Sequence, residues 1–130
     1  MTSCMRVAET IDFALSRFHF DSLAHDNSAT DSNVSSVETS PEARGQTPAP
    51  ILLHGTQSVP KFNSTTADEV TIFLALYRVE SKKVDLVMTM NVPTKTSDGG
   101  AVNADGLAAA KHDFGVAAAS LNIADFGLFV

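Results

Sequence analysis

The longest hydrophobic pattern in the chain lies between residues 70 and 92. Two apolar runs, residues 70–79 and 84–92, flank the charged turn Glu80-Ser81-Lys82-Lys83, which is typical of a β-hairpin. In the first run both alternating sets are apolar: Val70, Ile72, Leu74 and Leu76 face one way, and Phe73, Ala75, Tyr77 and Val79 the other. Antiparallel sheets usually leave one face to water, so this hairpin requires a covering layer on each side.

Two amphipathic helices are predicted before and after the hairpin. In residues 4–18 the apolar positions recur at helical spacing, as Val7, Ile11, Ala14, Leu15 and Phe18. The segment His19-Phe20-Asp21 is expected to carry the chain off the end of this helix. Asn103 or Asp105 is expected to cap a second helix, whose apolar stripe is Leu107, Ala110, Phe114, Ala117, Ala118 and Leu121.

The remaining segments are read as one strand and several loops. Residues 51–59 alternate in a way typical of a strand, which Pro60 would stop. A stretch of about residues 30–50 has no sustained period and contains several prolines, so we predict a mobile loop there, with Val34 and Val37 as candidates for a short strand. The expected fold is therefore a single α+β domain over residues 1–130, an antiparallel β-sheet flanked by helices on both faces.

The net charge limits the classes of partner, and the cysteine content indicates the compartment. The net charge of -6 and the pI near 5.0 argue against nucleic acid or an anionic membrane surface, because both require a concentrated basic patch. Cys4 is the single cysteine, which fits a reducing nuclear or cytosolic compartment. No run of the sequence is long and apolar enough to span a bilayer.

Motifs for catalysis or for nucleotide and metal binding are absent from the sequence. The chain has no GxxxxGK[ST] loop, no GxSxG elbow and no HExxH motif, so we expect a protein without catalytic residues and without a cofactor. The four histidines, His19, His25, His54 and His112, do not follow a known ligand spacing. They are interpreted as surface or boundary residues.

Four segments resemble, in the same order, the Ran guanine-nucleotide release factor family, small nuclear proteins that bind the GTPase Ran. These segments are FHFDSLAHDNSA at residues 18–29, HGTQSVPKF at 54–62, the hairpin at 75–93 and DFGLF at 125–129. The resemblance implies a helix-flanked antiparallel sheet of the kind shared with the photosystem subunit PsbP. It also implies a non-enzymatic protein of nucleus and cytoplasm that binds Ran, promotes guanine-nucleotide release and supports nucleocytoplasmic protein transport.

Members of that family normally begin with several dozen further residues that form strands and an acidic segment. The predicted helix of this chain starts almost at Met1, so we expect the sheet to lack those N-terminal strands. An unpaired sheet edge is a route to self-association, although a monomer is the expected state.

Exposed charges around the sheet are the candidate contacts with a GTPase. The resemblance and the position of these residues in loops and at the hairpin turn select Asp21, Asp26, Lys61, Lys82, Lys83 and Asp85. The alternative for the lysines is a solvated turn that keeps one end of the sheet soluble. Arg78 lies inside an apolar strand, so we expect it to pair with Asp85 on the opposite arm.

Two other functional classes stay open. One is an interaction or trafficking scaffold of the same fold with a different partner. The other is small-ligand binding between sheet and helix, which would require a pocket among Phe73, Tyr77, Phe114 and Leu121.

Overall fold

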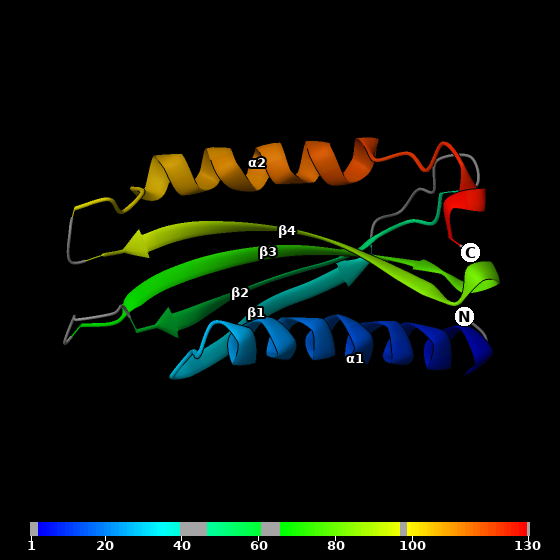
Figure 1. Cartoon of the computed structure of the whole chain (residues 1–130), viewed down its shortest axis with the longest axis horizontal. Helices are drawn as coiled ribbons and strands as arrows, with labels where there is room; N and C mark the ends of the chain where they lie inside the picture. The colour runs from blue at the N-terminus through cyan, green and yellow to red at the C-terminus, as the bar shows by residue number, and fades with distance from the viewer. Residues whose placement is uncertain (1–2, 40–46, 61–65, 97–98, 130) are drawn as a thin grey trace.

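A helix covers each face of the central sheet (Figure 1). The computed structural model describes residues 3–39, 47–60, 66–96 and 99–129, with side chains from residue 11 onward. The elements are α1 (Ser3–Asp26), β1 (Asp31–Thr39), β2 (Ile51–Val59), β3 (Asp68–Val79), η1 (Glu80–Lys82), β4 (Val84–Lys95), α2 (Ala104–Ser120) and η2 (Phe126–Leu128). The strands are antiparallel neighbours in the order β1-β2-β3-β4, which confirms the α+β prediction.

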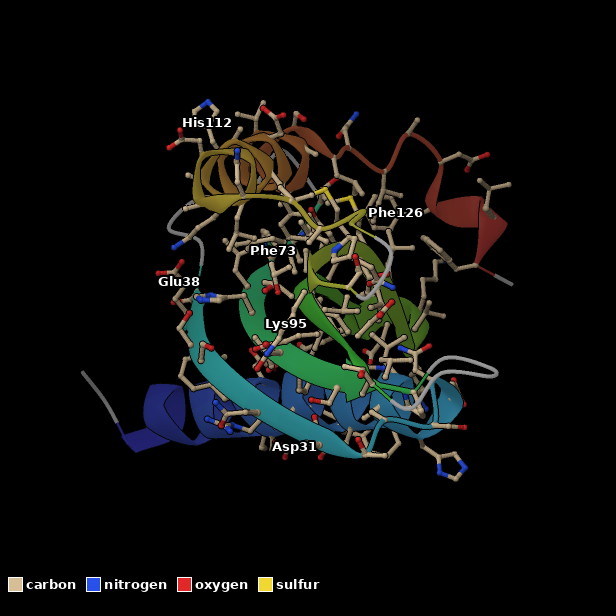
Figure 2. The ribbon with its side chains drawn as sticks, turned by 90° about the vertical axis from the view of Figure 1, so that its left-hand side faces the viewer. Asp31, Glu38, Phe73, Lys95, His112 and Phe126 are labelled. Carbon is tan, nitrogen blue, oxygen red and sulfur yellow. The ribbon has the colours of Figure 1, made fainter. Side chains whose placement is uncertain are left out.

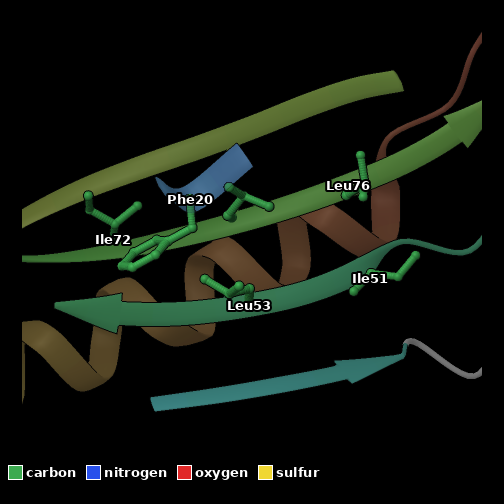
Figure 3. Packing of buried hydrophobic residues seen from close by; sticks show 6 residues of the cluster. Phe20, Ile51, Leu53, Ile72 and Leu76 are labelled. Carbon is green, nitrogen blue, oxygen red and sulfur yellow. The ribbon is translucent and has the colours of Figure 1, made fainter. Parts of the chain in front are cut away.

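The alternation within β3 divides the core into two layers. On one face Ile72, Leu74 and Leu76 are 0 % exposed and pack with Phe20 of α1 and with Ile51 and Leu53 of β2 (Figure 3). On the other face Phe73, Ala75 and Tyr77 pack with Phe114 and Ala118 of α2. The two apolar faces of the predicted hairpin therefore have the two covering layers that they require.

Residues 31–39 correct the predicted loop, because they form strand β1. Val34 pairs with Gly55 and Val37 with Leu53, while the register shifts between Val34 and Ser36. This bulge adds one residue, so both valines face α1 although three positions separate them. A regular strand would place them on opposite faces, which is why the period of two is absent from the sequence. Residues 40–46 of the predicted loop lie outside the described residues.

Helix α1 is longer than predicted and packs on the sheet through a different stripe. It continues through the expected exit segment to Asp26, because Phe20 and Leu23 extend the buried face that begins at Phe13. The prediction that Ile11 and Phe18 belong to the packed stripe was wrong, since they are 48 % and 61 % exposed.

The second helix follows its prediction more closely. Asn103 is its N-cap and accepts a hydrogen bond from the backbone N–H of Gly106 at 2.8 Å. Ala117, which was predicted in the apolar stripe, is exposed. The Tyr77 hydroxyl donates to the carbonyl of Ala118, and the layer between β3 and α2 is packed with side chains. This packing counts against a large ligand pocket there.

Candidate functional site

The end of the β3–β4 hairpin carries the lysines that were predicted to contact a partner. The turn consists of η1 and Lys83, whose φ of 55° is left-handed and whose N–H donates to the carbonyl of Glu80. Lys82 and Lys83 are exposed, and neither forms an ion pair within the described part of the chain. Both ammonium groups are therefore available to an acidic partner surface.

Arg78 joins this turn to helix α1. Its Nη1 lies 2.9 Å from Asp12 Oδ1 and 3.5 Å from Glu80 Oε1, and its Nε lies 3.7 Å from Asp85 Oδ1. Arg78 and Asp85 are also directly opposite each other in the sheet register. The hydrogen bond that Arg78 donates to the Asp12 carboxylate is the main cause that raises the pKa of Arg78, and partial burial opposes it. The predicted Arg78–Asp85 pair is confirmed, with Asp12 as a closer partner.

His19 extends the same charged cluster along α1. Its Nε2 lies 3.2 Å from Asp85 Oδ2, so Asp85 sits between the histidine ring and the Arg78 guanidinium. The ring of Phe18 meets the His19 ring edge-on, with centroids 5.6 Å apart. Because Phe18 and Ile11 are largely exposed, α1 presents apolar surface directly beside the charged cluster.

A shallow hollow of about 480 Å³ lies between α1 and the hairpin turn. Its walls combine apolar and charged side chains, namely Leu15, Arg78, Val79, Glu80, Lys83, Val84 and Asp85. Apolar surface surrounded by charges is the usual composition of a protein–protein interface, in which burial supplies affinity and the rim supplies orientation. We call this hollow, together with Ile11, Phe18 and Lys82, the α1–hairpin surface.

The structure brings together only some of the predicted contact residues. Lys82, Lys83 and Asp85 share the α1–hairpin surface. Asp21 and Asp26 are exposed in the last two turns of α1, and Asp26 lies at the other end of the sheet from η1 (Figure 1). Neither has a contact with the hairpin turn among the described residues. Lys61 lies outside the described residues.

Sequence reasoning missed Asp12 and His19 as members of the cluster. Each lies 66 residues from its partner, so no local pattern connects them. Their spacing of seven residues, two helical turns, places them on one side of α1 and is the signal that could have grouped them.

Neither metal-binding clusters nor membrane-spanning helices occur in the described parts of the chain. Among those residues no group of three or more His, Cys, Asp or Glu could hold a metal ion. Within the same residues, neither α1 nor α2 has the length and the apolar character that crossing a bilayer requires. The predicted boundary histidines include His19 and His54, which are half-buried and hydrogen-bonded to Asp85 and Ser36.

Comparison with known proteins identifies the family to which this chain is related. Residues 4–93 match the model of a family described as Ran-interacting Mog1 protein, a span that runs from α1 through most of β4. The chain belongs to the Ran-interacting Mog1 family. It is also 29% identical over 127 residues to the Ran guanine nucleotide release factor of Danio rerio, covering 91% of this chain and 69% of that protein. No solved structure matches the chain.

The Mog1 match contains every element that builds the α1–hairpin surface. Asp12, His19, Arg78 and Asp85 all fall within residues 4–93, whereas α2 lies beyond them. The surface is thus part of the segment through which the family is recognised.

Proposed function

We propose that this protein binds the GTPase Ran through the α1–hairpin surface and promotes release of its guanine nucleotide. Membership of the Ran-interacting Mog1 family is the observation that carries this proposal. The name of the zebrafish relative, a Ran guanine nucleotide release factor, supports the activity. Lys82, Lys83 and Asp85 are the proposed charged contacts, and Phe18 and Ile11 the apolar ones.

Such an activity needs differential binding and no catalytic residue. A protein that binds nucleotide-free Ran more tightly than loaded Ran must weaken the hold of Ran on its nucleotide by the same factor. Each tenfold loss of nucleotide affinity corresponds to about 1.4 kcal/mol of differential affinity for the two forms of Ran. A standard interface of roughly 800 Å² on each partner can supply several such steps.

The charges of the α1–hairpin surface suit a partner of mixed charge. Arg78 is held by Asp12 and Asp85, so these groups are largely neutralised within the protein. The two lysines beyond them are unpaired among the described residues and would approach carboxylates of the partner. Asp21 and Asp26 form a second, separate acidic group on α1, and they are proposed to contact basic side chains of Ran at the edge of the complex.

The cellular role follows from the partner. Control of the nucleotide state of Ran is the proposed route by which the protein supports nucleocytoplasmic protein transport, and nucleus and cytoplasm are the proposed locations. The second candidate, a scaffold of the same fold with another partner, shares the surface and differs only in what binds there.

A nucleotide-release titration tests the proposal. Ran carrying a fluorescent guanine nucleotide is mixed with increasing amounts of the protein, and the rate of fluorescence loss is recorded. We expect saturable acceleration, reduced at least fivefold by Phe18→Ala or by Lys82→Glu with Lys83→Glu. Lys95→Glu is the matched control, because Lys95 is an exposed lysine of β4 near its other end.

Two results would contradict the proposal in different ways. If the wild-type protein neither binds Ran nor accelerates release, Ran is not the partner and the scaffold alternative is favoured. If release is accelerated but Lys95→Glu reduces it as much as the hairpin substitutions, the assignment of the surface is wrong.

A further inference from the structure

The outer edge of β1 is open along one side of the sheet. Strand β1 is the first in the strand order, and no strand pairs with its outer edge among the residues that the structure describes. Figure 2 shows it as the outermost ribbon on that side, running between Glu38 and Asp31. The edge of a sheet presents unpaired backbone N–H and C=O groups, so it can accept another strand.

The sequence of β1 contains neither the lysine nor the proline that often protects an edge strand. Lysine and proline are common at edges because they prevent pairing with other chains. The opposite edge strand, β4, ends with Pro93, Thr94 and Lys95, whereas β1 reads DSNVSSVET and contains neither residue type. Its bulge lies between Val34 and Ser36, so the segment after the bulge is regular and paired with β2.

A small apolar pocket of about 110 Å³ lies directly beside this edge, on the face that α2 covers. Phe73, Phe114 and Leu52 provide its apolar lining, Ser36 and Glu38 of β1 one wall, and Lys111 and Gly115 of α2 the other. Ser36 Oγ lies 2.7 Å from His54 Nδ1, and the His54 ring lies 5.9 Å from the Phe73 ring. The polar wall is therefore held in place by contacts within the protein.

Gly115 contributes backbone and no side chain to the pocket wall. A Cβ atom at this position would have no heavy atom within 4 Å, so a side chain there would enter free space. The pocket is large enough for one aliphatic side chain and too small for a typical ligand of about 300 Å³ or more.

We propose that the β1 edge binds an extended basic segment of a partner protein as a fifth strand, with one apolar side chain of that segment in the Gly115 pocket. Main-chain hydrogen bonds would supply affinity, and the pocket would select the side chain, as in other cases of strand addition. The charge of the segment follows from β1, whose two charged residues, Asp31 and Glu38, are both acidic. The edge and the pocket share no residue with the α1–hairpin surface, so this inference does not rest on the Ran proposal.

A second copy of this chain fits the edge less well. A second β1 strand would bring the same two acidic residues, Asp31 and Glu38, to the junction and no basic residue. A pair of acidic strands gains no attraction between opposite charges, whereas lysines on a partner strand do, so the charge pattern favours a basic partner strand over self-pairing.

Nuclear magnetic resonance on the complete 130-residue chain tests the proposal. The probe is a synthetic seven-residue peptide in which lysines alternate with valine, leucine and valine, with both ends blocked. We expect saturable shifts of backbone amide signals in residues 31–39 and 111–115. A matched peptide with glutamates in place of the lysines should bind at least tenfold more weakly.

Two variants test separately how much the charge and the pocket contribute to peptide binding. Glu38→Lys should weaken binding of the basic peptide about fivefold, and Gly115→Leu, which adds a side chain to the pocket wall, about tenfold. Circular dichroism and the urea midpoint of both variants should stay at or above the wild-type values, because both positions are at the surface or have open space.

Three results would overturn the inference. The first is equal binding of the basic and acidic peptides, and the second is a peptide footprint on β4 or on the hairpin turn. The third is concentration-dependent broadening of residues 31–39 without peptide, which would identify a second copy as the occupant.

Discussion

Strands β3 and β1 belong to the same sheet but differ in how far their side chains are buried. In β3 every residue from Thr71 to Tyr77 is buried, on both faces, whereas in β1 most residues are exposed and none is buried. Strand β3 has a neighbour on each side, and β1 has β2 on one side. A central strand can be predicted from its own apolar sequence, whereas an edge strand is recognised from the strand with which it pairs.

The contrast predicts where the protein is sensitive to substitution. Core burial is worth more free energy than docking of an exposed edge, because the cost of a smaller side chain grows with the area and cavity that it leaves. Loss of a β3 contact should therefore affect the whole domain, and loss of a β1 contact should affect mainly the edge.

The largest expected effect is at the centre of β3. Leu74→Ala removes a side chain that is 0 % exposed and should lower the free energy of unfolding by about 3 kcal/mol. Val37→Ala in β1 is the matched substitution, and its half-buried side chain should cost about 1 kcal/mol. Urea denaturation followed by circular dichroism measures both, and equal losses would contradict the comparison.

The second effect concerns the contact between β1 and its neighbour. A Cβ at Gly55 would lie 2.5 Å from the carbonyl oxygen of Asn33 and 2.8 Å from the Phe20 ring. Gly55→Ala should therefore cost about 2 kcal/mol and should increase amide hydrogen exchange in β1 more than in β3. Gly115→Ala is the control, since its Cβ meets open space. Uniform exchange in both strands would show that β1 is not the weaker element.

A smaller effect is expected for the ion pair that ties β3 to α1. The side chains of Arg78 and Asp12 are 28% and 26% exposed, so solvent screens their attraction. A double-mutant cycle with Arg78→Met and Asp12→Asn should give a coupling of about 0.5–1 kcal/mol, decreasing with added salt. The same cycle with Glu80→Gln, at a longer distance and more exposed, should give less.

The smallest expected effect is a pH dependence of stability that arises from His54. This residue belongs to β2 and contacts Ser36 of β1. Burial, and then the positive charge of Lys111, lower the pKa of His54 below its ordinary value of about 6.5. The folded protein therefore binds fewer protons than the unfolded chain at acidic pH. The stabilising contribution is complete above pH 6.5 and is lost as pH falls towards the folded pKa.

His54→Gln should remove this dependence. The difference in urea midpoint between wild type and variant should favour the wild type more at pH 7.5 than at pH 5. A difference that is constant with pH, or that grows at pH 5, would contradict the assigned direction.

The candidate site was predictable where it is local in sequence. The turn after Val79, the exposed lysines and the Arg78–Asp85 pair follow from the hairpin register, because opposite positions of two adjacent strands can be counted. Asp12 and His19 were not predictable in this way. Their contacts depend on the angle at which α1 crosses the sheet, and no local spacing encodes that angle.

Strand β1 shows the same limit for the fold. Its valines are three positions apart, which matches a strand only when a bulge lies between them, and a bulge is recognisable only against the partner strand. The same limit applies to α1. Ile11 and Phe18 have the spacing of one helical face, but the face that meets the sheet is that of Phe13 and Phe20.

The sequence by itself determined the α+β class, the two apolar faces of the hairpin, the turn between its arms and the existence of both helices. These features depend on periods within a dozen residues, which hydrophobic burial imposes directly. The tertiary structure decided the bulged edge strand, the exposed face of α1 and the cluster around Arg78. Each depends on residues that are far apart in the chain, and packing alone brings them into contact.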